Sequence, residues 1–138
     1  MIKHILVGYD GSDTSRRAVA LALDMTAASN GRVRVITVVR VSQGGDDAAV
    51  MMTDTDCQTR QRQLREAMDE LAGDQAGRID TQVILGEPGH ALLGQVAEYD
   101  IDHIVIGHTE RGALARWLLG SVSGELLERA RVPVTVVR

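Results

Sequence analysis

Two glycine-containing segments hold the residues that could bind a ligand. The first, Gly8-Tyr9-Asp10-Gly11-Ser12, directly follows an apolar run and precedes a helical pattern. The carboxylate of Asp10 could accept hydrogen bonds from a ribose or a base, or help to hold a metal ion. Ser12, Asp13 and Thr14 are residue types that cap helix N-termini, so capping alone also accounts for them. Asp10 is therefore the first candidate for a ligand contact.

The second segment runs over residues 104–123 and reads IVIGHTERGALARWLLGSVS. Its last four residues, Gly120-Ser121-Val122-Ser123, open a predicted helix whose free backbone N–H groups lie at the positive end of the helix dipole. A phosphate could bind there, although a glycine turn with a serine cap gives the same pattern. His108 follows Gly107 in this segment, but no nucleophile is paired with it in the sequence.

Five short runs rich in Val and Ile predict β-strands. They are Ile5–Val7, Val33–Val39, Ile79–Leu85, Ile104–Ile106 and Val132–Val137. The first, fourth and fifth are apolar almost without alternation, which is typical of strands covered by helices on both faces. This pattern favours a parallel sheet.

Helical patterns separate the predicted strands. Two of them have apolar residues at i, i+3, i+4 and i+7, which places those residues on one helix face. They are Ala18, Leu21, Ala22 and Met25, and Leu64, Ala67, Met68 and Leu71. Two further helices are predicted at residues 89–99 and 121–129.

The alternation of strands and helices predicts an α/β fold with one domain over residues 1–138. Right-handed crossovers give a three-layer α/β/α sandwich around a five-stranded parallel sheet, for which we expect the strand order 3-2-1-4-5. In such a sheet, ligands bind beyond the carboxyl ends of the strands where the winding reverses, here between the first and fourth strands. Both candidate segments follow those two strands. Residues 41–56 show no clear period and are expected to form an irregular excursion near this site.

Composition excludes several classes of function. Hydrophobic residues make up 44% and charged residues 25% of the chain, and the net charge of −4 is spread without a basic block that would attract nucleic acid or an anionic membrane. Aromatic residues make up only 2%, too few for base-stacking surfaces. No run approaches the ~18 apolar residues of a membrane span. The single Cys57 cannot form an internal disulfide, which favours a cytoplasmic location, and no His or Cys pair has metal-ligand spacing.

Three stretches of the chain resemble the universal stress protein family. The opening KHILVGYDGSDTSRRAVALAL is similar to the family's first strand and helix, and Leu85-Gly86-Glu87-Pro88 to its turn after the third strand. The closing LLGSVSGELLERARVPVTVVR is similar to its last helix and strand. The resemblance covers the whole chain and implies an adenine nucleotide alpha hydrolase-like, Rossmann-like fold and a role in the stress response.

The resemblance also implies a nucleotide site. In family members that bind ATP, the loop after the fourth strand has a glycine, two residues, a second glycine, nine residues, a third glycine and then Ser or Thr. Gly107 and Gly120-Ser121 keep the outer spacing, whereas Glu110 stands at the middle glycine and Gly112 follows two positions later. The implied site places adenine near Val38 and Ile106, ribose near Asp10, and the phosphates near Gly107, Gly120, Ser121 and Val122. Further expected nucleotide contacts are Gly8, Tyr9, His108, Gly112 and Ser123, and Mg²⁺ would accompany ATP.

Glu110 opposes phosphate binding in two ways. A side chain at a position that needs a glycine conformation costs about 1 kcal/mol. A carboxylate roughly 4 Å from a phosphate charge is repelled by about 1 kcal/mol in water and about 4 kcal/mol near a protein surface. Arg111 and Arg116 could offset this repulsion. Two hypotheses therefore stand: a non-catalytic, ATP-binding regulator, and a dimeric interaction or scaffold protein of the same family that binds no ATP.

An enzyme is not predicted. A phosphoacceptor receiver domain would need an Asp after the third strand and a Lys after the fifth, where this chain has Leu85-Gly86 and Arg138. A P-loop needs a Gly-Lys pair after a strand, and the only lysine is Lys3. Any ATP hydrolysis should be slow and incidental.

The last predicted strand suggests a homodimer. In a monomer its apolar edge would stay unpaired. The family resemblance implies that two copies pair this strand across a two-fold axis, through Val132, Pro133, Val134, Thr135 and Val136.

Overall fold

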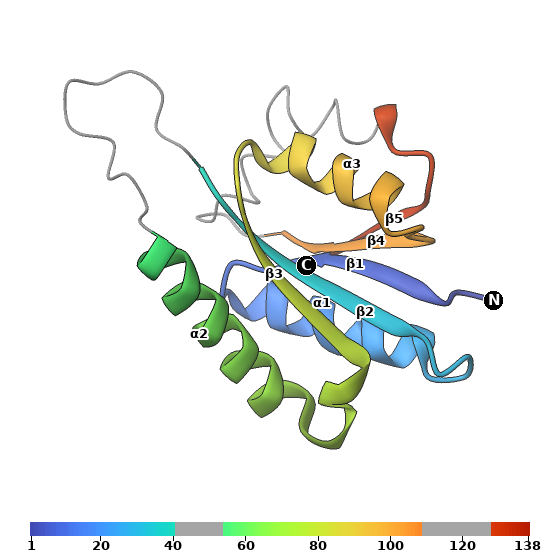
Figure 1. Ribbon diagram of the computed structural model, residues 1–138. Helices are drawn as coiled ribbons and strands as arrows, with labels where there is room; N and C mark the ends of the chain where they lie inside the picture. Colours follow the sequence, from blue (N-terminus) through green and yellow to red (C-terminus); the bar gives the residue numbers. More distant parts are fainter. Residues whose placement is uncertain (41–53, 109–127) are drawn as a thin grey trace.

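The computed structural model describes residues 1–40, 54–108 and 128–138 (Figure 1). In chain order the elements are β1 (His4–Gly8), α1 (Asp13–Thr26), β2 (Arg32–Val39), α2 (Asp54–Ala72), a 3-10 helix η1 (Gly73–Arg78), β3 (Ile79–Leu85), α3 (Pro88–Glu98), β4 (His103–Gly107) and β5 (Val134–Val137). Strands and helices alternate as predicted.

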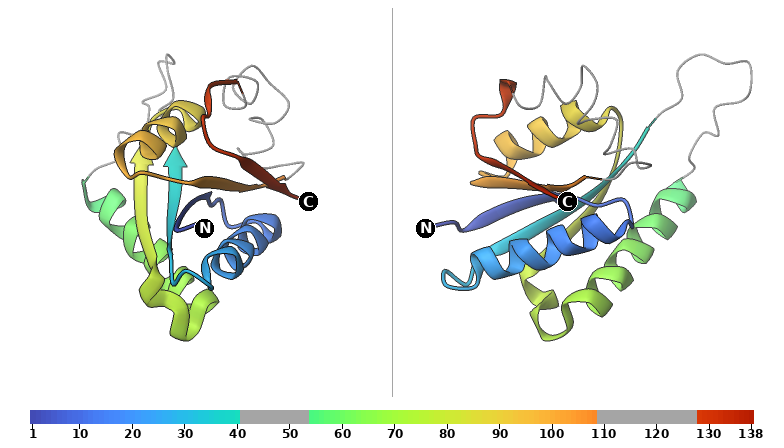
Figure 2. Two further views of the ribbon diagram at one scale, coloured as in Figure 1. Left: turned by 90° about the vertical axis from the view of Figure 1, so that its right-hand side faces the viewer. Right: turned by 180° about the vertical axis from the view of Figure 1, so that it is seen from behind.

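The five strands form one parallel sheet of order β3-β2-β1-β4-β5, which confirms the predicted topology. Helices α1 and α2 cover one face of the sheet, and α3 lies over the other (Figures 1 and 2). The described part of the chain is thus the three-layer α/β/α sandwich that the sequence predicts. The winding reverses between β1 and β4, because β2 and β3 lie on one side of β1 while β4 and β5 lie on the other.

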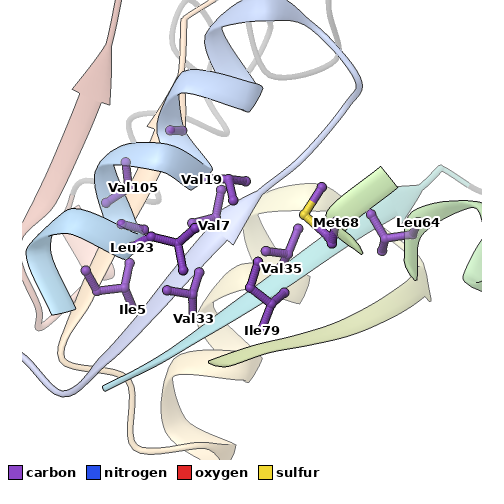
Figure 3. Packing of buried hydrophobic residues seen from close by; sticks show 12 residues of the cluster. Ile5, Val7, Val19, Leu23, Val33, Val35, Leu64, Met68, Ile79 and Val105 are labelled. Atoms are coloured by element: carbon purple, nitrogen blue, oxygen red, sulfur yellow. The ribbon is translucent and has the colours of Figure 1, made fainter. Parts of the chain in front are cut away.

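Each face of the sheet has its own hydrophobic cluster. Alternate strand residues, including Val7, Val33, Val35 and Val105, pack against Val19 of α1 and its neighbours (Figure 3). The opposite face carries Leu6, Ile36, Ile104 and Ile106, which pack with Leu92 of α3. The central strands are buried on both faces, which explains their nearly continuous apolar sequences.

Helix α1 begins at a side-chain cap. Ser12 has extended backbone angles, and its Oγ accepts a hydrogen bond of 3.2 Å from the Ser15 N–H. The buried face of the helix consists of Ser15, Ala18, Val19, Ala22, Leu23 and Thr26. Leu21 and Met25, predicted on this face, are half-buried at its margin.

Several predicted boundaries differ from the structure. The last strand begins at Val134 rather than Val132, because Pro133 has no N–H and Val132 precedes the ladder with β4. Helix α2 begins at Asp54, so the last three residues of the segment predicted to be irregular are helical. On this helix Leu71 is 37% exposed rather than buried. Of the helix predicted at residues 121–129, only residues 128 and 129 are described, and both are helical.

Candidate functional site

The carboxyl ends of three central strands meet at the edge of the sheet predicted to bind a ligand. Gly8, the last residue of β1, pairs with Ile36 of β2 on one side and Ile106 of β4 on the other. The chain stays in register just beyond the strands, since the Tyr9 N–H donates to the Ile36 carbonyl at 2.8 Å and the His108 N–H to the Val137 carbonyl at 2.7 Å. The structure therefore brings together the described residues of both candidate segments.

The turn between β1 and α1 holds Asp10 in a defined position. Oδ1 of Asp10 accepts a hydrogen bond of 2.9 Å from the Ser12 N–H, and Gly11 has a φ of 85°, which favours glycine. The Asp10 side chain is exposed, and its Oδ2 has no hydrogen-bond partner among the described residues. This oxygen can accept a hydrogen bond from a ligand hydroxyl. Ser12, by contrast, caps α1, which is the structural alternative that the sequence left open.

Gly107 allows α1 to approach β4. A Cβ on Gly107 would lie 2.6 Å from the carbonyl carbon of Thr14 and 2.7 Å from the backbone nitrogen of Ser15. No such atom fits, so the first turn of α1 rests directly on the end of β4. This packing gives Gly107 a structural reason that the sequence did not reveal, beside the ligand role predicted for it.

The side chain of Tyr9 packs between residues of α1 and α2. The ring is half-buried against the hydrophobic cluster under α1 and α2. A hydrogen bond to Tyr9 raises the pKa of the Arg16 guanidinium above its ordinary value. These two residues line a hollow of about 400 Å³ with Ala67, Glu70 and Leu71. The Tyr9 carbonyl, just beyond β1, accepts a hydrogen bond of 2.9 Å from the Thr37 hydroxyl.

The two residues predicted near adenine differ in exposure. Val38, near the end of β2, is half-buried and packs against the cluster under α3. Ile106 is fully buried in that cluster. Val38 can therefore offer apolar surface to a ligand, whereas the side chain of Ile106 supports the site from within the core.

The remaining predicted phosphate contacts lie outside the described residues. They are Gly112, Gly120, Ser121, Val122 and Ser123. Glu110, predicted to oppose phosphate, and Arg111 and Arg116, predicted to offset its charge, also lie outside these residues. His108 is described and half-buried, and its backbone is joined to β5 through the hydrogen bond to Val137.

The strand predicted to form a dimer contact lies at the sheet edge. Thr135 accepts or donates a hydrogen bond of 2.6 Å with Nε2 of His103 on β4, while Val136 is 39% exposed. Val132 is half-buried and Pro133 exposed, and the Pro133 carbonyl accepts from the Ile104 N–H at 2.9 Å. Among the described residues, no strand pairs with the outer side of β5.

Sequence reasoning missed a buried polar cluster below α3. Arg34 of β2 is only 8% exposed, and it donates to the side-chain oxygens of Gln82 and Gln95, the latter at 2.5 Å. Its Cζ lies 3.6 Å from the centre of the Tyr99 ring. The signal in the sequence was a charged residue inside the predicted strand Val33–Val39, whose only other polar residue is Thr37. The guanidinium is thus already engaged by side chains of its own chain, which makes it a structural group rather than a ligand contact.

Metal clusters and membrane-spanning helices are both absent from the described ranges. Residues 1–40, 54–108 and 128–138 contain no group of three His, Cys, Asp or Glu side chains that could hold a metal ion. In the same ranges, no helix has the length and apolar character needed to cross a membrane.

Comparison with known proteins identifies similar chains. A family model described as the universal stress protein family matches residues 1–138. The curated universal stress protein Rv2624c of Mycobacterium tuberculosis is 30% identical over 138 residues, which cover 99% of this chain and 48% of that protein. The chain therefore spans about half the length of such curated relatives.

Solved structures share the fold. Universal stress protein UspA from Lactobacillus plantarum matches with a TM-score of 0.77 and 23% identity, covering 99% of this chain and 98% of that one. A universal stress protein in complex with cAMP matches with a TM-score of 0.66 and 26% identity, covering 99% and 97%. An Archaeoglobus fulgidus universal stress protein in complex with dAMP has a TM-score of 0.68 and 22% identity, covering 100% of each chain.

Proposed function

The chain belongs to the universal stress protein family, and from that premise we propose that it is a non-catalytic regulator of the stress response that binds an adenine nucleotide, with ATP as the first candidate. The proposed site lies at the carboxyl ends of β1, β2 and β4. The observation that carries the proposal is the pairing of Gly8 with Ile106 at the ends of β1 and β4, which places Asp10 and Gly107 just beyond these strands, where the winding of the sheet reverses. The cAMP-bound relative supports an adenine nucleotide as the ligand class.

The described residues can supply two parts of such a site. Oδ2 of Asp10, which has no partner in the described ranges, would accept a hydrogen bond from a ribose hydroxyl, since Oδ1 is already used by the Ser12 N–H. Val38 would offer apolar surface to the base. The phosphates are assigned, from the sequence alone, to the backbone from Gly107 to Ser123.

A magnesium ion would arrive with the phosphates rather than occupy a protein site of its own. Mg²⁺ keeps several waters and is commonly held by one or two carboxylates together with substrate phosphates. Asp10 fits that donor chemistry, but the described ranges hold no group of three acidic or His and Cys side chains for a resident metal. Such an ion would neutralise part of the phosphate charge and so reduce the repulsion expected from Glu110.

Glu110 supports a second candidate function. Glu110 replaces the middle glycine of the loop found in ATP-binding members. If it prevents phosphate binding, the chain acts as a dimeric interaction or scaffold protein that binds no ATP. The β5 edge is the proposed homodimer contact in both readings. The free Cys57 accords with the proposed cytoplasmic location. No catalytic residue is proposed.

Calorimetric titration of nucleotide-free protein with MgATP and with cAMP tests the proposal. We expect saturable binding by the wild type, and an affinity about tenfold lower in Asp10→Ala, because a hydrogen bond to a charged group is lost. Asp13→Ala is the matched control, since this nearby carboxylate is 94% exposed and pairs only with Arg16 among the described residues. Its affinity should equal that of the wild type.

The variant Glu110→Gly separates the two candidate functions. If the wild type gives no binding heat while Glu110→Gly binds nucleotide, Glu110 prevents binding in the wild type and the scaffold function is supported. If neither protein binds either nucleotide, the nucleotide-binding proposal is wrong. Equal losses in Asp10→Ala and Asp13→Ala would show that Asp10 makes no specific ligand contact.

A further inference from the structure

Strand β3 forms one edge of the sheet, opposite to β5. An edge strand presents backbone N–H and C=O groups to any extended chain that approaches. The sequence of β3 ends in Thr-Gln-Val-Ile-Leu, an uncharged run rich in β-branched residues, and Leu85 at its end is 44% exposed. Such a strand is well suited to pair with a copy of itself.

The side chain of Gln61 on α2 occupies two of these backbone groups. Its Nε2 donates to the Thr81 carbonyl at 3.0 Å and to the Thr81 hydroxyl at 2.9 Å. Its Oε1 accepts from the Val83 N–H at 2.8 Å. The Gln61 amide thus binds the carbonyl of one β3 residue and the N–H of the residue two positions later. A residue of a neighbouring parallel strand would bind the same two groups.

Arg65, one helical turn after Gln61, extends the cover. Its guanidinium donates to the Ile79 carbonyl at 2.7 Å and to the Ala76 carbonyl at 2.9 Å. Asp69 holds it in place through two hydrogen bonds of 3.0 and 2.8 Å. Helix α2 lies along β3 in Figure 1, which allows both side chains to reach the strand.

The helix backbone itself does not close the edge. A hollow of about 580 Å³ lies between α2 and β3, and it is lined by Cys57, Gln58, Gln61, Arg62, Arg65, Thr81, Gln82 and Val83. The edge is therefore approachable where these side chains do not bridge it.

We propose that the Gln61 side chain occupies the β3 backbone groups that a sixth strand would bind, and thereby prevents a second copy of this chain from adding to the sheet at β3. This inference goes beyond nucleotide binding, because β3 and Gln61 lie apart from Asp10 and Gly107. It also gives the two sheet edges different roles: side chains of α2 occupy backbone groups of the β3 edge, and association of copies is confined to other surfaces.

The variant Gln61→Ala tests the proposal in the full chain. We expect hydrogen exchange of the Val83 amide to become about tenfold faster, because its hydrogen-bond acceptor is removed. In a concentration series by light scattering, we expect species larger than those of the wild type. Gln58→Ala is the matched control, because Gln58 is exposed on the same helix, lines the same hollow and makes no hydrogen bond to β3 in the described structure.

A double variant shows whether new association uses the β3 edge. Val83→Pro removes the N–H that Gln61 covers, and proline is tolerated where an edge N–H faces away from the sheet. Gln61→Ala combined with Val83→Pro should return to the wild-type mass distribution. An unchanged Val83 exchange rate in Gln61→Ala would overturn the proposal. So would faster exchange without larger species, or larger species that persist in the double variant.

Discussion

Gly107 shows how one residue can serve both packing and a ligand site. Its position at the end of β4 is where the first turn of α1 makes contact, at distances that exclude a Cβ. The same contact sets the turn that carries Asp10, because α1 begins only three residues after it. A change at Gly107 should therefore affect both stability and the candidate site.

Gly107→Ala is expected to destabilise the protein by about 1–3 kcal/mol, as overpacking in a well-packed region does. Urea unfolding followed by circular dichroism measures this change. Gly94→Ala is the control, because Gly94 is exposed on α3 and a methyl group added there would meet no atom within 4 Å. That substitution should stabilise the protein by up to about 1 kcal/mol through helix propensity. A loss no greater in Gly107→Ala than in Gly94→Ala would contradict the packing role.

A buried histidine on β4 forms a side-chain hydrogen bond to β5, beside the backbone ladder that joins the two strands. His103 is 9% exposed and forms a hydrogen bond of 2.6 Å with Thr135. Desolvation by burial lowers the pKa of His103 below its ordinary value of 6.5. The unfolded chain therefore binds a proton at a higher pH than the folded protein does, so the contribution of His103 to stability is fully present above pH 6.5 and is lost as the pH falls toward the folded pKa.

Unfolding free energies measured in urea at about pH 7.5 and about pH 5 should thus show a loss at acid pH that His103→Asn reduces. His90→Gln is the control, because His90 is exposed on α3 and its replacement should leave the loss unchanged. Asp80 contributes to the background in the same direction, since its hydrogen bond with Arg32 lowers its pKa and its protonation removes stability at still lower pH. An equal acid loss in the wild type and His103→Asn would show that His103 does not cause it.

The elements whose pattern is local were predictable from the sequence. The first four strands lie within one residue of their predicted bounds at each end, because each is a run rich in Val and Ile bounded by polar or glycine residues. The polar cluster around Arg34 was not predictable, since Gln82 and Gln95 reach it only after the sheet and α3 have assembled. The steric role of Gly107 likewise depends on α1, from the other end of the chain. Sequence reasoning found where the candidate site lies but not why its glycine is required.

At the scale of the whole molecule, the two sheet edges differ in how their backbone groups are satisfied. Side chains of α2 cover the edge of β3. On β5, the carbonyls of Pro133 and Val137 bond to β4, so the intervening residues Val134 and Val136 turn their backbone groups outward. This edge is the one available for pairing between two copies, in accord with the proposed homodimer.

Val136→Lys should convert the proposed homodimer into a monomer. Val136 is 39% exposed on the edge strand, so a lysine fits without disturbing the core, while two copies paired across a two-fold axis would bring like charges together. Light scattering over a concentration series gives the mass. Leu85→Lys is the control, since Leu85 is similarly exposed, at 44%, but ends the opposite edge strand. The Leu85→Lys variant should remain dimeric. A monomeric wild type at micromolar concentration would rule out association through β5. A Val136→Lys variant that stays dimeric would do so too, because Val136 is the only described residue of this edge whose backbone faces outward and whose apolar side chain is so exposed.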